Sequence, residues 1–238
     1  LSERVDLLID YSSNYEVAML VAQKAQNQGV PLIMVDLPVQ NAVYFGANNL
    51  LAGQIAGENA AQYITDRWDG KIDSILILEK AISGSVVRQR VIGSIHELRE
   101  RVQVNSRTIK HIDCTRGIDY YSHKLERYLQ KLEPDETCLV LSFGEDTTVE
   151  THEIVSMYAE ERSIIMVGQN YSYHVAHMMQ QPNSPLIGVV SYAQDQYGER
   201  IISLATRLLE GRRVEPVNYT EHEWIPNPRF FPHQSLSK

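Results

Sequence analysis

Short apolar runs alternate with amphipathic segments almost from end to end, and this alternation limits the fold more than any other feature of the chain. The apolar run at residues 5–10 is followed by Glu16–Gln28, where apolar residues recur at helical spacing until Gly29 closes the segment. Similar pairs recur about every 25–30 residues. Strands that return through helical crossovers form parallel sheets, so the sequence predicts an α/β fold.

The predicted elements cover most of the chain. Strands are predicted at residues 5–10, 32–35, 74–78, 108–113, 138–143, 164–168 and 186–190. Helices are predicted at residues 16–28, 52–65, 85–101, 120–132, 149–160, 173–180 and 194–210. The piece that joins the second strand to the second helix is predicted to be irregular.

The second predicted strand ends on a carboxylate. Residues 32–35 form a continuous apolar run, which is typical of a strand covered on both faces, and Pro31 and Pro38 bracket it. Asp36 follows this run directly. Ligands of open parallel sheets bind outside the carboxyl ends of the strands, so Asp36 is the first candidate for a ligand-binding residue. Alternatively, Asp36 caps a helix or organises a turn.

The charge balance bears on the kind of partner. The net charge of -8 argues against a nucleic-acid surface within this segment, because phosphate binding needs clustered Lys and Arg. No run of about 18 apolar residues predicts a membrane span, and the first residues do not form a signal peptide. Because the chain enters a strand almost at once, we expect it to begin in mid-fold, with a signal peptide or a DNA-binding head as candidates for what preceded it.

The motifs of common α/β enzymes are missing. No G-x-G-x-x-G opens a helix after a strand, no G-x-x-x-x-G-K-[ST] occurs, and no G-x-S-x-G is present. Glu145 and Asp146 pair two carboxylates, but capping of the following helix explains them better. Because no nucleophile stands with a base, we expect neither an enzyme nor a cofactor.

The cysteines and two histidines give further expectations. Cys114 and Cys138 lie near strand-like runs without metal-ligand spacing, so we expect buried free thiols, with a disulfide as the alternative. His174 and His177 stand at i, i+3 on a predicted helix with no third ligand nearby, which favours a surface position over metal binding.

Several pieces of the sequence, in this order, resemble the type 1 periplasmic-binding-protein family. They are VDLLIDYSSN, KAQNQGVPLIMVDLP, YFGANNLLAGQIAGENAAQYI, SGSVVRQRVIGSIHEL, CLVLSFGEDTTVETHEIV, SIIMVGQN and PLIGVVSYAQDQYGERIISLATRLLEG. The resemblance extends from Val5 to about Trp224 and rests on the order of all the pieces. The family includes the sugar-binding proteins of ABC importers and the effector domains of lac-repressor-type transcription factors.

The resemblance implies two Rossmann-like lobes with parallel sheets, joined by three crossing segments and closing on a small ligand, usually a sugar. It places the crossings near residues 47–49, 190–192 and 217–219. The N-terminal lobe would then comprise residues 1–47 plus 192–218, and the C-terminal lobe residues 48–191 plus 219–238. Members of the family begin with two further βα units, so the first lobe is expected to be truncated at its N-terminus.

The resemblance also implies ligand-binding residues. Asp36 matches a cleft position where a carboxylate accepts hydrogen bonds from sugar hydroxyls. Arg90 matches an R-x-x-G position whose guanidinium binds hydroxyls or a ring oxygen, with a structural salt bridge as the alternative. Asn170 stands where many members carry an acidic residue. Tyr192 takes a usual glutamine position, either as a ligand contact or as a buried hinge residue.

Two further candidates and one departure complete the expected site. Tyr11 and Arg116 are expected from topology to line it. The family often carries an asparagine-aspartate pair where this chain has Gly144 and Glu145, and Gly144 has no side chain for a contact. With aspartate, arginine, asparagine and tyrosine, the site suits a neutral polyhydroxylated ligand such as a sugar.

Two functional settings remain. The main hypothesis is a periplasmic or extracellular solute receptor that delivers its ligand to a membrane importer permease, which the sequence VGQN and the tail EHEWIPNPRFFPHQ favour. The alternative is the effector domain of a cytoplasmic regulator that contacts DNA only through a missing N-terminal head, which two unpaired cysteines favour. Either setting leaves a homodimer open.

Overall fold

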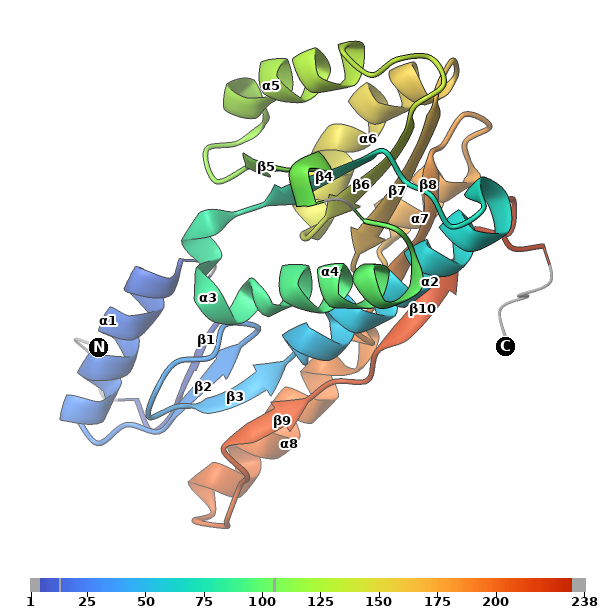
Figure 1. The fold of residues 1–238 in the computed structure, drawn as a ribbon. Coiled ribbons are helices and arrows are strands. Elements are labelled where there is room, and N and C mark those ends of the chain that lie inside the picture. The colour runs from blue at the N-terminus through green and yellow to red at the C-terminus, as the bar shows by residue number, and fades with distance from the viewer. Residues whose placement is uncertain (1–4, 13, 105, 233–238) are drawn as a thin grey trace. The chain divides into compact units, whose positions relative to one another are not determined.

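The computed structural model describes residues 5–12, 14–104 and 106–232 (Figure 1). The chain divides into two compact units. Unit 1 comprises Leu1–Asn49, Ile82–Arg88 and Tyr192–His222, and unit 2 comprises Leu50–Ala81, Gln89–Ser191 and Glu223–Lys238. The end of the tail EHEWIPNPRFFPHQ, from residue 233 on, lies outside the described residues.

The units differ in detail from the lobes that the sequence implies. Residues 82–88 group with unit 1, although the expected second lobe runs without interruption from residue 48 to residue 191. Unit 1 also extends to Asn49 and to His222, a few residues beyond the expected crossings.

Unit 1 is built on a four-stranded sheet in the order β1-β2-β3-β9, whose neighbouring strands are all parallel. The strands are β1 (Leu8–Asp10), β2 (Leu32–Val35), β3 (Val43–Gly46) and β9 (Val217–Tyr219). The helices are α1 (Tyr15–Asn27), α3 (Gly84–Val87) and α8 (Tyr197–Leu209), and the 3-10 helix η3 (Gln194–Gln196) leads into α8.

A helix packs on each face of this sheet. Leu32 and Met34 of β2 share a hydrophobic cluster with Ala18 of α1, whereas Ile33 of β2 shares another with Leu204 of α8. Successive residues of a strand point to opposite faces, so α1 and α8 cover opposite faces. This double cover explains why β2 is apolar throughout and why a polar side chain first appears where the strand ends.

Two strands of unit 1 were not predicted. The piece after Asp36 was expected to be irregular, but it contains β3, and the expected crossing at residues 217–219 is β9. These strands pair with each other, with Tyr44 opposite Val217 and Phe45 opposite Asn218. Both strands are short, and the partner of β9 lies far away along the chain, whereas β3 also pairs with the nearby β2.

Unit 2 is built on a six-stranded sheet in the order β10-β8-β7-β6-β4-β5. The strands are β4 (Ser74–Glu79), β5 (Ile109–Asp113), β6 (Thr137–Ser142), β7 (Ser163–Gln169), β8 (Leu186–Ser191) and β10 (Glu223–Pro226). All neighbours are parallel except β10, which runs antiparallel to β8. The prediction of parallel sheets is therefore correct for the βα repeats and wrong for this last strand, which joins the sheet edge without a helical crossover.

Helices cover both faces of the unit 2 sheet. They are α2 (Asn49–Trp68), α4 (Gln89–Arg101), α5 (Ile118–Gln130), α6 (Glu145–Ala159) and α7 (Tyr173–Gln180). The short 3-10 helix η2 (Ser106–Thr108) also belongs to unit 2, whereas η1 (Ala81–Ser83) spans the border between the units. Residues of α5, α6 and α7 form one hydrophobic cluster with Leu76 and Leu78 of β4. Ile75 and Ile77, on the other face, are also fully buried. Figure 1 shows α2 and α4 on the opposite side of the sheet from α5.

The single helix predicted over residues 85–101 is broken. Helix α3 ends at Val87, Arg88 follows it, and α4 begins at Gln89. Val87 packs against the cluster of α1 and β2 in unit 1, whereas Val91 and Leu98 of α4 are buried in unit 2. The amphipathic pattern runs through both helices, but the two halves bury their apolar residues in different cores.

The two cysteines and the histidine pair lie where the sequence predicts them. Cys114 and Cys138 are buried and free, as expected. His174 and His177 lie exposed on α7. In the described ranges, no group of three or more His, Cys, Asp or Glu side chains could hold a metal ion. None of the helices in this part of the chain is long and apolar enough to cross a membrane.

Candidate ligand-binding site

Asp36 lies at the carboxyl end of β2 in unit 1. Its backbone is left-handed, with φ at 62°, and its N–H donates to the carbonyl of Phe45 in β3 over 2.9 Å. A Cβ on Gly46 would lie 2.5 Å from Asp36 Oδ1, and Gly46 itself has a φ of 152°. Glycine is therefore required beside Asp36 both for space and for backbone conformation.

Tyr197 of α8 fixes the carboxylate of Asp36. Its hydroxyl donates to Asp36 Oδ1 over 2.8 Å, and its ring packs edge-on against Phe45 with centroids 5.0 Å apart. Burial raises the pKa of Tyr197 far above its ordinary value, and the negative charge of Asp36 adds to the rise. The phenol thus stays protonated and remains a donor. Sequence reasoning missed Tyr197, because 161 residues separate it from Asp36.

The other two candidates of unit 1 lie in contrasting surroundings. Tyr11 follows β1 directly and is 72% exposed. Tyr192 is 4% exposed, and its ring lies 5.4 Å from that of His222. His222 Nε2 in turn accepts the backbone N–H of Asn48 over 3.1 Å. Residues 48, 192 and 222 all lie close to borders of unit 1. The ligand contact and the hinge role of Tyr192 both stay predictions.

Asn170 lies at the carboxyl end of β7 in unit 2. Its backbone is left-handed, with φ at 75°, and its N–H donates to the carbonyl of Val190 in β8 over 2.7 Å. The side-chain Nδ2 donates to Glu145 Oε2 on the first turn of α6. Oδ1 is buried, and no donor among the described residues reaches it. A buried acceptor of this kind is uncommon and is suited to a hydrogen bond from a ligand.

Glu145 has a second role besides the expected one. It does lie in the first turn of α6, where a carboxylate suits the helix dipole, as the sequence predicts. It also accepts the hydrogen bond from Asn170, which capping alone would not have indicated. Gly144 precedes it with an extended backbone and serves as the N-cap of α6, so the departure from an asparagine-aspartate pair leaves one acidic side chain in place.

Arg90, the second residue of α4, is 8% exposed and donates from Nη1 to the carbonyl of Phe143 over 3.2 Å. Helices α2 and α4 pack closely at this point. A Cβ on Gly53 of α2 would lie 2.1 Å from the Arg90 carbonyl oxygen, so only glycine leaves room for the backbone of Arg90. Phe143 directly follows β6, and Glu145 comes two residues later. Arg90, Glu145 and Asn170 therefore gather at the carboxyl ends of β6 and β7.

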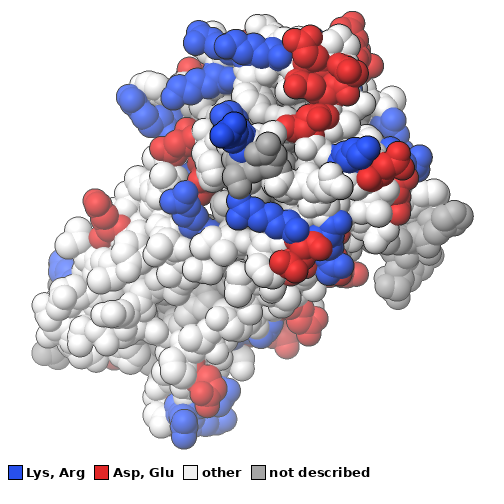
Figure 2. Space-filling model, viewed as in Figure 1, with Lys and Arg blue, Asp and Glu red and all other residues white. Residues whose placement is uncertain are grey.

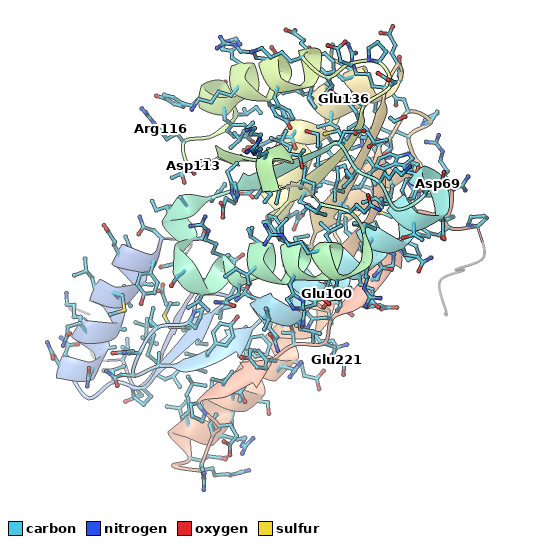
Figure 3. All side chains as sticks on the ribbon, viewed as in Figure 1. Asp69, Glu100, Asp113, Arg116, Glu136 and Glu221 are labelled. Atoms are coloured by element: carbon cyan, nitrogen blue, oxygen red, sulfur yellow. The ribbon has the colours of Figure 1, made fainter. Side chains whose placement is uncertain are left out.

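Arg116 lies away from this group. Figure 3 shows it projecting from the loop between β5 and α5. It is exposed, and its guanidinium stacks over the ring of Tyr120 at 4.1 Å. Strand β5 is at the sheet edge, three positions from β7, which corresponds to about 14 Å at the usual strand spacing. A role for Arg116 in ligand binding stays a prediction.

A basic surface is not seen on the face in view. Figure 2 shows Lys and Arg side chains interspersed with Asp and Glu over unit 2 on this face. Lys80 forms an ion pair with Asp146. This mixture agrees with the negative net charge of the chain and gives no support to a phosphate-binding surface there.

No family model and no curated protein matches the sequence. Solved structures do match the fold. An ABC sugar transporter subunit from Rhodobacter sphaeroides 2.4.1 has a TM-score of 0.75 at 20% identity, over 94% of this chain and 79% of that one. An ABC transporter periplasmic solute binding protein from Actinobacillus succinogenes 130z, with bound D-allose, has a TM-score of 0.75 at 15% identity, over 98% and 82%.

A third solved structure has the same fold as these two. An ABC transporter solute binding protein from Agrobacterium vitis, bound with α-D-tagatopyranose, has a TM-score of 0.77 at 15% identity, over 94% of this chain and 76% of that one. The chain has the type 1 periplasmic-binding-protein fold. Asp36 and Asn170 each follow a strand directly and are hydrogen-bonded to Tyr197 and Glu145, respectively. Their contact with a ligand stays a prediction.

Proposed function

We propose that this protein is a non-enzymatic receptor for a sugar or polyol and that it delivers its ligand to an ABC-type importer. The observation that carries the proposal is the buried Oδ1 of Asn170, an acceptor without a protein donor among the described residues, at a strand end of a fold shared with sugar-transporter subunits. A hydroxyl is the simplest ligand group that would satisfy it.

The other polar groups support the same class of ligand. Asp36 adds acceptors in unit 1, and Arg90 brings a guanidinium to the carboxyl end of β6 in unit 2. A site that holds hydroxyls by buried polar groups discriminates strongly against ligands that lack them. Three solved structures of the same fold carry D-allose, allitol and D-fucose, which are polyhydroxylated and neutral.

The regulator hypothesis loses the feature that favoured it. Both cysteines are buried, and burial raises the pKa of each thiol to about 12. Buried thiols of this kind resist oxidation in any compartment, so they no longer argue for a reducing one. A periplasmic or extracellular location, a permease partner and closure of the protein on its ligand all belong to the receptor proposal.

A thermal-shift screen tests the proposal first. The protein would be heated with pentoses, hexoses, polyols and nucleosides, among them D-allose, allitol and D-fucose. A ligand at 100 times its Kd stabilises the folded protein by roughly 2.7 kcal/mol, which is easily measured as a rise in Tm. A folded protein with no shift for any sugar or polyol would contradict the proposal.

Calorimetric titration of variants then tests the residues. Asp36→Ala and Arg90→Ala are each expected to weaken the binding of a sugar hit by at least about 2 kcal/mol, because each leaves a ligand polar group without its partner. Arg101→Ala is the matched control, since Arg101 lies at the other end of α4 and pairs on the surface with Glu58 and Glu97. Normal binding by both site variants would show that the site is assigned to the wrong residues.

A further inference from the structure

The side-chain amide of Asn170 has only one orientation that fits its surroundings. One end of the amide faces Glu145 Oε2. An ionised carboxylate only accepts hydrogen bonds, so the group facing it has to be the NH2, and the carbonyl oxygen has to point the other way. The backbone of Asn170 is also fixed, because its N–H donates to the carbonyl of Val190.

This orientation decides which atom is left for a ligand. Asn170 is 6% exposed, and its Oδ1 meets no donor in the part of the chain that the structure describes. An asparagine that could turn over would offer either a donor or an acceptor at this point. With Glu145 in place, only the acceptor is offered.

We propose that Glu145 is a positioning residue that fixes the amide of Asn170 and thereby makes unit 2 selective for a ligand group that donates a hydrogen bond. The selectivity for a ligand group rests on the proposed function, whereas the orientation of the Asn170 amide does not. A hydroxyl or an amino group meets the requirement. An ether, a methoxy group or a carbonyl oxygen does not, because two acceptors would then face each other in a buried place.

The geometry is tested without any ligand. In the 15N-labelled protein, the side-chain NH2 signals of Asn170 are assigned by their loss in Asn170→Asp. These signals are expected to shift in Glu145→Gln, because an amide then replaces the carboxylate that accepts the hydrogen bond from Asn170. Asp146→Asn, which removes the neighbouring carboxylate of the same helix turn, is the matched control and should leave the signals in place. Signals of Asn170 that stay in place in Glu145→Gln would overturn the proposal.

Selectivity is tested by exchanging the donor and the acceptor. Asn170→Asp keeps an outward oxygen but places a second carboxylate oxygen against Glu145, and it is expected to weaken the binding of D-allose, allitol or D-fucose at least tenfold. The double variant Glu145→Gln with Asn170→Asp restores a donor between the two side chains, and it is expected to bind within about threefold of the wild type.

The outcomes separate the two proposals. A double variant as weak as Asn170→Asp alone, while melting like the wild type, would overturn the positioning role. If none of the three probes binds the wild-type protein, the result counts against the proposed function, and the NH2 signals of Asn170 alone decide the orientation.

Discussion

Asp36 and Asn170 occupy corresponding places in two different sheets. Each directly follows a buried parallel strand, each has a left-handed backbone, and each donates its N–H to a carbonyl of the next strand. Left-handed conformations are uncommon for residues other than glycine, and asparagine and aspartate tolerate them best. The same turn therefore ends both strands and presents a short polar side chain beyond the sheet.

Removal of the Tyr197 hydroxyl should lower the stability of unit 1. Tyr197→Phe keeps the ring against Phe45 but removes the donor to Asp36, so we expect the free energy of unfolding to fall by about 1–2 kcal/mol. Urea unfolding followed by circular dichroism measures the change. Tyr219→Phe, on an exposed position of β9, is the control and should have no effect beyond about 0.5 kcal/mol. Equal effects of both variants would contradict the role given to the hydroxyl.

A methyl group at Gly46 should be poorly tolerated. Its Cβ would lie 2.5 Å from Asp36 Oδ1 and 2.9 Å from the Asp36 backbone, so Gly46→Ala is expected to cost more than about 2 kcal/mol of stability. At Gly198, near the start of α8, an added methyl would meet nothing within 4 Å beyond the adjoining helix backbone, and Gly198→Ala should gain up to about 1 kcal/mol. Measured against the wild type, the Tm is expected to fall in Gly46→Ala and to rise in Gly198→Ala.

Stability should fall in mild acid because of His152. This side chain is buried on α6 beside Ser184, and burial lowers its pKa to about 4 from an ordinary 6.5. Between these values the unfolded chain binds a proton that the folded protein does not, so stability is lost as the pH falls from 6.5 and levels off below 4, by up to about 3 kcal/mol. Urea midpoints measured from pH 7.5 to pH 4 give the profile.

The variant His152→Gln isolates this contribution. Acidic groups titrate in both proteins, so the difference between their profiles reports His152 alone. His174→Gln, at an exposed position on α7, should leave the profile unchanged. A His152→Gln profile that runs parallel to that of the wild type would show that the buried imidazole does not cause the loss.

Both thiols should be unreactive while the protein is folded. Cys114 and Cys138 are buried, and their raised pKa values leave almost no thiolate at pH 8. Ellman's reagent is therefore expected to label neither cysteine in buffer and both in 8 M urea. Rapid labelling of a thiol in the native protein would mean that its surroundings open more readily than the structure indicates.

The residues found from the sequence and those missed differ in one respect. Asp36 was recognised because an apolar strand runs directly into it, and Asn170 and Arg90 because the resemblance covers their surroundings. Tyr197 and strand β9 owe their positions to partners more than 150 residues away, as the 161-residue separation of Tyr197 and Asp36 illustrates. Contacts at that range leave no periodic pattern in the sequence.

Glu145 shows a different limit. Its place at the start of a helix was predicted correctly, and this explanation accounted for the carboxylate by itself. The contact with Asn170 adds a second role to the same atoms. A residue whose type is already explained by local structure gives no sign that it also serves a distant partner.

The pairing of β3 with β9 has a consequence for the newly made chain. Asn218 Nδ2 donates to the carbonyl of Tyr44 across 174 residues, and β9 lies beyond every helix of unit 2. During synthesis, β9 therefore emerges after every helix of unit 2, and until then the edge of β3 that β9 occupies has no partner strand. Unpaired strand edges promote aggregation, so the unfinished chain exposes such an edge for most of its synthesis.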